Sequence, residues 1–398
     1  MQLVRWVFFT GMLAMMSTSP VRLAESADSD LQPSVSSQST AVCGAQRPVM
    51  VVFVHGTILP YIKLGMVKNL LHDFPSNISY EHTVADVLRY QGCYQYQPIA
   101  DYGLRLLSEA DGVRSVVHKR NQLYGSLFEK IWKHTFGKQI SASYAFGWDG
   151  SLSAPRRILA AHALYNSLVR ERENVALANN CLSTDVEIVV VAHSHGGSLG
   201  LLLAAEETAK QRGLSIEHLI LLGTPVQQET AYLVHHAMFH NIWSLYSMGD
   251  VVQVLDVVTT KGASKRQFPS EHQPATLREC AIELIDETTG DTYLPSHVQL
   301  WFYDVQHMHP FFLQAYSPFN PLPISLFTPL ILKLLMDAPH HHGPVRMGKK
   351  DGNVFASVKT DHVSLESHSG HFVTTSALKE LTLSYALFKP YEKHFLMS

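Results

Sequence analysis

Residue 194 is a serine placed where an apolar strand would turn into a helix. The run "VVVAHSHGGSLGLLL" (189–203) sets three valines before this serine and three glycines after it. A serine at the apex of a strand–turn–helix unit adopts a strained backbone conformation, and the chain packs so tightly that the positions two before and two after it must be small. Ala192 and Gly196 fill those positions. The pattern predicts an outward-pointing hydroxyl at a helix N-terminus, where N–H groups favour developing negative charge, which suits a nucleophile.

A serine hydroxyl needs a base that takes its proton and an acid that orients the base. In the chain order Ser, acid, His, the acid should end the strand that follows "LLGTP" (221–225). Asp250 in "LYSMGDVV" (245–252) comes directly after an apolar strand and a glycine turn, and Asp256 is the second choice. We therefore predict Asp250 as the acid.

Several histidines could serve as the base. His297 in "GDTYLPSHVQLWF" (290–302) lies 47 residues beyond Asp250, which leaves room for one crossover and one strand of a parallel sheet. We predict His297, and we expect His193 to pack under the turn because its side chain leaves on another side. The alternatives follow later apolar segments: His307 and His309 in "QHMHP", and His368 and His371 in "ESHSGHF".

The elements that must hold these residues are apolar, β-branched runs that alternate with helical patterns. Such alternation is typical of an α/β fold, with a mostly parallel sheet covered by helices on both faces. The helices are expected from Pro155 and again after Ser194. The expected strands are "VMVVFVHGT" (49–57), "SASYAFGWDG" (141–150), "DVEIVVV" (185–191), "HLILLGTPV" (218–226), "NIWSLYSMGDVV" (241–252) and "ECAIELIDE" (279–287).

The motifs "AHSHGG" (192–197), "VVFVHGT" (51–57) and "LGTPV" (222–226) resemble the core motifs of the α/β-hydrolase family, in particular those of bacterial secreted lipases. The resemblance covers roughly residues 50–300. It implies an α/β-hydrolase fold and a serine enzyme, and it does not extend to the candidate lids at 58–140 and 298–352. An N-terminal signal peptide would make this enzyme secreted or periplasmic. The enzyme would cleave carboxylic esters, of lipids or other acyl groups, through an acyl-enzyme and without a cofactor. The backbone N–H groups of Thr57 and His195 would form the oxyanion hole.

Two other classes of function remain open, because a fold does not determine a substrate. The same three residues could serve a phospholipase, a thioesterase or an acyltransferase. Alternatively, a secreted binding protein could keep the fold without turnover.

The chain is expected to divide into a signal peptide (1–24), a flexible leader (25–47) and one hydrolase domain (48–398). Two stretches, 58–140 and 298–352, exceed what the sheet requires and are candidate caps or lids. The apolar segment 321–336 is either core or a lid helix that contacts a lipid or membrane surface. Residues 376–388, "SALKELTLSYALF", are expected to form the last helix.

Composition excludes some partners. The net charge is −3 and no basic stripe is present, which argues against nucleic acid. The three histidines in "PHHHGP" (339–344) are expected in a solvated loop, so no metal site is predicted. The 23 histidines make the surface charge sensitive to pH between about 5 and 7. Four cysteines allow two disulfides or free buried thiols.

Overall fold

The computed structural model describes residues 46–57, 103–107, 116–150, 153–255, 264–301, 317–319, 322–365 and 372–388. The expected signal peptide and nearly all of the expected leader lie outside these residues. Within the described part of the chain, no helix is long and apolar enough to cross a membrane.

The centre of the fold is a parallel sheet made by the strands that the sequence predicts. Its strands lie in the order β7-β6-β5-β4-β1-β3, and each pairs in parallel with its neighbours. The strong apolar runs account for the burial of the central strands β1 and β4 on both faces, whereas buried residues alternate with partly exposed ones in β7. The strand bounds are β1 (Val49–Val54), β3 (Ile140–Gly147), β4 (Glu187–His193), β5 (Ile216–Leu222), β6 (Phe239–Tyr246) and β7 (Leu277–Ile285).

Further strands extend the sheet at both ends, and several of them are antiparallel. At one end, β2 (Gly103–Leu106) pairs antiparallel with β3. At the other end, β9 (His341–Lys350) is parallel to β7, and β10 (Asn353–Leu365) and β11 (Phe372–Ser384) follow antiparallel. The short β8 (Thr292–Tyr293) pairs with β7.

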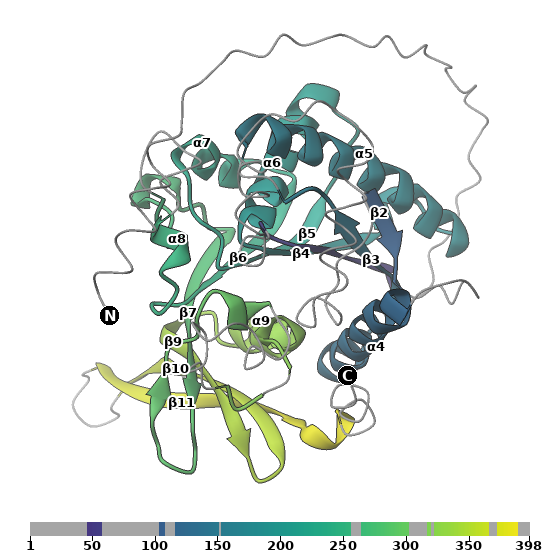
Figure 1. The fold of residues 1–398 in the computed structure, drawn as a ribbon. Helices are drawn as coiled ribbons and strands as arrows, with labels where there is room; N and C mark the ends of the chain where they lie inside the picture. Colours follow the sequence, from purple (N-terminus) through teal and green to yellow (C-terminus); the bar gives the residue numbers. More distant parts are fainter. Residues whose placement is uncertain are drawn as a thin grey trace, which may run out of the picture. The chain divides into compact units, whose positions relative to one another are not determined.

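Helices cover both faces of the sheet (Figure 1). Met50, Val52 and Val54 of β1 pack in one core with α5 (Ala154–Ala178) and α6 (His195–Lys210). Val51 and Phe53 point the other way, into a second core with α4 (Val116–Phe136) and α9 (Thr328–Asp337). The α/β architecture with helices on both faces of a mostly parallel sheet is therefore confirmed.

The remaining helical elements are short. Two α-helical turns are α7 (Gln228–Ala231) and α8 (Val252–Leu255). The 3-10 turns span Ser183–Asp185, Tyr232–His235, Ser270–His272, Val298–Leu300, Ile324–Phe327 and Tyr385–Leu387.

The two stretches expected to form caps contribute to the core where the structure describes them. In 58–140, β2 joins the sheet, and α4 buries Leu127, Phe128 and Ile131 against its face. In 298–352, α9 buries Leu330 to Leu332, Leu334 and Leu335, and β9 is a strand of the sheet. Of the two alternatives for residues 321–336, the structure has the core helix. Most of "PHHHGP" likewise belongs to the start of β9 instead of a loop.

The prediction of a last helix over 376–388 is wrong, because most of this segment lies in β11. The pairing of β11 with β10 runs without interruption from Asn353↔Ser384 to Leu365↔Phe372. Near its end the strand alternates, with Leu383 buried between the exposed Thr382 and Ser384. Long-range pairing has overridden the local helix propensity of Ala, Leu, Lys and Glu.

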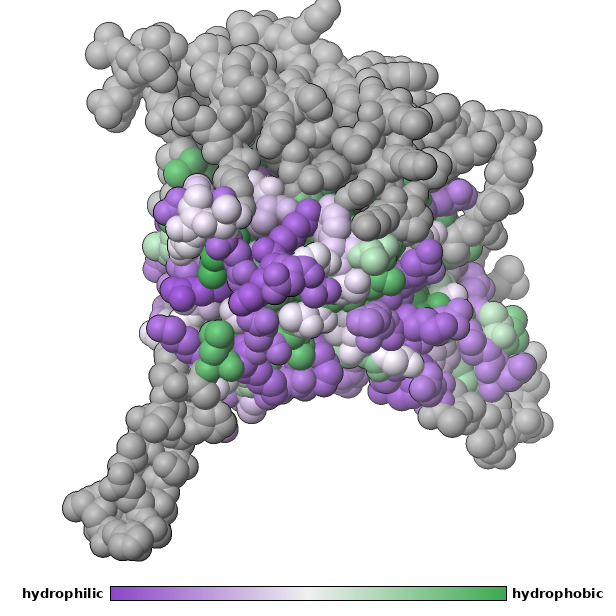
Figure 2. Space-filling model, turned by 90° about the horizontal axis from the view of Figure 1, so that it is seen from below, coloured by the Kyte–Doolittle hydropathy of each residue, from purple (hydrophilic) through white to green (hydrophobic). Residues whose placement is uncertain are grey.

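The face seen from below in Figure 2 is covered mainly by hydrophilic side chains. Apolar side chains appear there only in small, separate groups among the residues that are coloured. Scattered apolar side chains of this kind are ordinary for a water-exposed surface.

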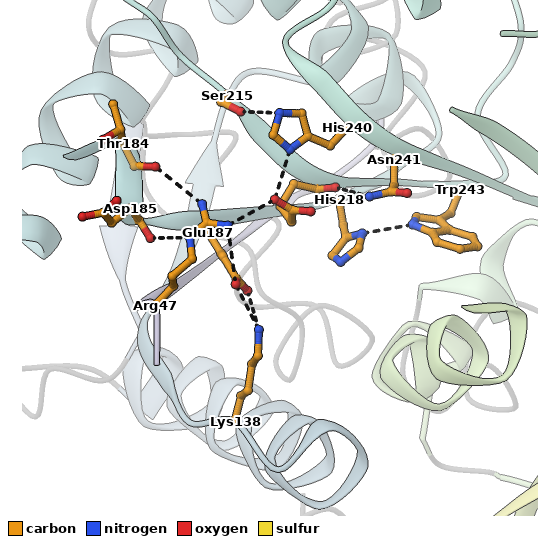
Figure 3. Close-up of polar contacts among 11 residues, drawn as sticks. Arg47, Lys138, Thr184, Asp185, Glu187, Ser215, His218, His240, Asn241 and Trp243 are labelled. Carbon is orange, nitrogen blue, oxygen red and sulfur yellow. Dashed lines mark hydrogen bonds and ion pairs between the residues drawn. The ribbon is translucent and has the colours of Figure 1, made fainter. Parts of the chain in front are cut away.

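A network of ion pairs lies at the amino ends of the parallel strands (Figure 3). Glu187, the first residue of β4, accepts from Lys138 at 3.0 Å and lies 3.8 Å from the guanidinium of Arg47. Arg47 also approaches Glu217, which pairs with His240 at 3.1 Å. These contacts hold β4, β5 and β6 together at the edge opposite Ser194.

Cys280 of β7 has a free, buried thiol. Burial raises the pKa of this thiol to about 12, so it stays protonated and unreactive at neutral pH. Cys43 and Cys93 lie outside the described residues.

Candidate active site

The predicted site residues gather at the carboxyl ends of the parallel strands. The chain passes from β1 to β3 on one side and later returns to β4 on the other side of β1. In open α/β sheets, such a reversal of strand order leaves a crevice at the carboxyl edge where ligands bind. The segment after β1 and the turn after β4, with Ser194 at its apex, meet at this point.

Ser194 has the strained conformation that the sequence predicts. Its φ of 53° and ψ of −130° are far from the conformations that a non-glycine residue prefers. The residue is the turn between the last residue of β4 and the first of α6, and its N–H donates to the carbonyl of Leu222 at 2.9 Å. A Cβ at Gly196 would lie 2.5 Å from the carbonyl oxygen of His55, so only glycine fits there.

The segment that follows β1 lies against the serine. A Cβ on Gly56 would come within 2.5 Å of the Cβ of Ser194. Thr57, the expected oxyanion donor, is therefore the next residue after a point of direct contact with the turn. His195, the other expected donor, is the first residue of α6, and the first N–H groups of a helix point out of its N-terminus.

His55 fixes the shape of this segment as a neutral imidazole. Its Nε2 accepts from the backbone N–H of Trp148 at 3.4 Å, so Nδ1 carries the hydrogen and donates to the carbonyl of Gly56 at 2.8 Å. The indole N–H of Trp148 donates in turn to the carbonyl of His55 at 2.8 Å. Burial lowers the pKa of His55 from 6.5 to about 4, in agreement with a neutral ring.

Asp250 and His297 form a close, buried pair. His297 Nδ1 lies 2.7 Å from Oδ2 of Asp250, whose side chain has no exposed surface. The other carboxylate oxygen, Oδ1, accepts from the backbone N–H groups of Val252 and Gln253 at 3.0 and 3.2 Å. The carboxylate is thereby held in one orientation, and it directs the Nδ1–H tautomer of His297, which leaves Nε2 as a base.

Gly223 is a site residue that the sequence reasoning missed. It follows β5 with a φ of +57°, and a Cβ there would lie 2.9 Å from Asp250 Oδ2 and 3.3 Å from His297 Nδ1. The pair therefore packs directly on the backbone of Gly223. The glycine at the end of the apolar run "HLILLG" was the signal that could have indicated this close approach.

Arg266 and Gln253 also hold the segment of Asp250 in place, although the sequence did not predict them. The guanidinium of Arg266 donates to the carbonyl oxygen of Asp250 at 2.9 and 3.2 Å. The amide of Gln253 donates to the carbonyl of Thr224 at 3.0 Å, and thus ties the acid's loop to the residue after Gly223. Nothing in their spacing along the chain distinguishes these two residues.

His193 packs beneath the turn, as expected. Its ring is stacked on Trp301 with centroids 5.5 Å apart, and it lies 4.6 Å from the ring of His297. Since His193 directly precedes Ser194, this contact brings the ring of His297 close to the turn of Ser194. Among the hydrogen bonds of the described residues, however, none joins the Ser194 hydroxyl to His297. Such bonds are often long in unliganded sites and tighten around a bound substrate.

The competing candidates fall outside the described residues. These are Asp256 and the histidines His307, His309, His368 and His371. The described part of the chain contains no group of three His, Cys, Asp or Glu side chains arranged to hold a metal ion.

Comparison of the chain with protein-family models, with curated proteins and with solved structures finds no match.

Proposed function

We propose that this chain is an exported serine hydrolase with an α/β-hydrolase fold, which cleaves carboxylic esters through an acyl-enzyme. One observation carries the proposal: a buried Asp–His pair lies at the same sheet edge as a serine in a strained strand-to-helix turn. Along the chain, Ser194 comes first, Asp250 second and His297 third, which is the order Ser, acid, His of this fold.

In the proposed mechanism, His297 Nε2 takes the proton of Ser194 as the hydroxyl oxygen attacks the ester carbonyl carbon. Asp250 stabilises the imidazolium through Nδ1. The backbone N–H groups of Thr57 and His195 stabilise the negative charge on the carbonyl oxygen. His297 then returns the proton to the leaving alcohol, and water releases the acyl group by the same steps.

Apolar side chains beside the acid–base pair support an acyl or lipid ester as the substrate. Met248 and Val251 flank the loop of Asp250 and are each 56% exposed. Leu294, three residues before His297, is 49% exposed. It lies close to Gly249, because a Cβ added to Gly249 would be 2.8 Å from the Cβ of Leu294. An acyl chain or a lipid surface can cover such side chains.

A fluorophosphonate probe tests the proposal, because it labels a serine only where a base activates it. We expect wild type to be labelled and Ser194→Ala not to be labelled, with a loss of esterase kcat of about 10⁶-fold. Ser198→Ala is the matched control, since this buried serine lies one helical turn further along α6. Equal labelling of wild type and Ser194→Ala, in folded protein, would refute the nucleophile.

The remaining classes are separated by substrate. Rates on p-nitrophenyl esters of increasing chain length, on phospholipids and on acyl thioesters distinguish esterase, phospholipase and thioesterase, and added alcohols reveal acyl transfer. A folded wild type that neither reacts with the probe nor turns over any of these would favour a binding protein of the same fold.

A further inference from the structure

His193 connects the turn of the nucleophile to the segment that carries the base. Its Nε2 lies 3.1 Å from the backbone carbonyl oxygen of His297. A carbonyl only accepts, so Nε2 carries the hydrogen and donates it. The side chain of the residue before Ser194 is thus hydrogen-bonded to the main chain of the base itself.

The same ring makes packing contacts on two further sides. It stacks on Trp301 with an interplanar angle of 14°, at the end of the turn that begins after His297. Its Nδ1 lies 3.1 Å from where a Cβ of Gly56 would be, beside the segment after β1. His193 is 2% exposed. It contacts the segment of His297, Trp301 and the segment after β1.

The buried ring is neutral. Burial, together with the neighbouring imidazole of His297, lowers the pKa of His193 well below 6.5. A neutral imidazole can keep one N–H donor on the carbonyl of His297 throughout the pH range in which His297 must act as a base.

We propose that His193 is a positioning residue, whose Nε2–H holds the backbone of His297 so that its imidazole stays between Asp250 and Ser194. The inference rests on the proposed function for the role of His297, while the contact itself is independent of it. His193 does not touch the reacting atoms and acts through His297.

Two substitutions separate the hydrogen bond from packing. His193→Gln keeps an N–H donor near the position of Nε2 and loses the ring. His193→Phe keeps a ring that can stack on Trp301 and loses the donor. If the hydrogen bond positions the base, the His193→Gln variant retains most of the activity and the His193→Phe variant does not. If His193 only fills space, the order is reversed.

The first measurement is steady-state kinetics on a p-nitrophenyl ester. We expect His193→Phe to lower kcat by about 10²-fold with little change in KM, the effect of a small misplacement of a catalytic group. His193→Gln should stay within about tenfold of wild type, by the same argument. His218→Phe is the matched control, because this partly buried histidine accepts a hydrogen bond from the indole N–H of Trp243 near the opposite edge of the sheet. It should leave kcat unchanged.

The second measurement does not need activity. Hydrogen–deuterium exchange, read by mass spectrometry, should show faster exchange in His193→Phe for the peptide that covers residues 295–301. The reporters are the amides of Gln299 and Trp301, which bond within this segment. In His193→Gln the exchange should match wild type.

The two measurements distinguish the possible failures. Suppose that wild type has no esterase activity, while His193→Phe still shows faster exchange over residues 295–301 and His193→Gln does not. In that case the proposed function fails, and the structural link between His193 and the segment of His297 stands. If His193→Phe keeps wild-type kcat and exchange, or if Gln is more damaging than Phe, the positioning role is overturned.

Discussion

Nδ1 of His297 and Oδ2 of Asp250 lie 2.7 Å apart, although 47 residues separate them in the chain. The intervening chain includes β7, which runs parallel to β6 and returns by way of β8 to the same edge of the sheet. The strand topology therefore brings these two residues together. The role of the pair can be tested by replacing the carboxylate of Asp250 with an amide.

Asp250→Asn should abolish most of the ester hydrolysis while the protein stays folded. An amide in this position can donate to Nδ1, which favours the wrong tautomer of His297. We expect kcat to fall by about 10⁴-fold, which is the loss that this change causes in a Ser-His-Asp triad. Asp291→Asn, on the exposed turn after β7, is the control. An Asp250→Asn protein with wild-type kcat would show that another carboxylate is the acid.

Gly223→Ala should damage both stability and activity. The residue has a positive φ, and its new Cβ would lie 2.7 Å from Leu300 Cδ1 as well as against the Asp250–His297 pair. Gly213 has a similar φ of +66°, but a Cβ added there would have no atom within 4 Å, so Gly213→Ala measures the strain without the clash.

We expect Gly213→Ala to lower the free energy of unfolding by about 1 kcal/mol, the typical cost of backbone strain. Gly223→Ala should cost about 1–3 kcal/mol more, through overpacking. Urea denaturation measures both. If the two variants lose equal free energy of unfolding and Gly223→Ala keeps the wild-type kcat, the Asp250–His297 pair can move away from residue 223 without penalty.

Acid should destabilise the fold through His55. Its pKa is about 4 in the folded protein and 6.5 when exposed, so the unfolded state binds more protons between these values. The contribution of a neutral His55 is fully present above pH 6.5 and is lost as the pH falls towards 4. For this one residue we expect a decrease of about 2 kcal/mol between pH 7 and pH 5.

Urea denaturation of wild type and His55→Gln at both pH values checks this. The decrease should be smaller in the variant, and it should persist in part because His193 is buried in the same way. Identical pH dependence in the two proteins would exclude His55 as a source of acid sensitivity.

Glu187→Gln should affect stability and not activity. Glu187 begins β4 and Ser194 follows its end, so about 20 Å of strand separates them. The partners Lys138 and Arg47 are 40% and 45% exposed, so the ion pairs are screened by water and should contribute no more than about 1 kcal/mol. The difference in the free energy of unfolding should shrink at high salt. A fall in kcat would mean that the two edges of the sheet are coupled.

The central strands and the turn at Ser194 could be predicted because their signals are local. A β-branched run, a small residue on either side of the serine and a chain order of Ser, acid and His are all visible in the sequence. Asp250 and His297 could be paired for a related reason, since parallel strands bring their carboxyl ends to one edge.

Other features depend on contacts between distant segments. The contact of Gly223 with the acid–base pair exists only once β5, β6 and the segment after β8 have met. Leu381 and Leu383 lie in a segment of strong helix formers, yet pairing with β10 makes it a strand. The apolar run in α9 could be assigned to core or lid only after its burial was known.

The strain at Ser194 has a consequence for the evolution of this chain. Glycine adopts a φ of 53° without penalty, and a non-glycine residue in such a conformation costs about 1–3 kcal/mol. Ser194→Gly should therefore unfold at a higher urea concentration than wild type while it loses all labelling by the probe. Selection for stability alone would favour glycine at this position, so the proposed catalytic role of the hydroxyl would explain why a less stable serine is found there.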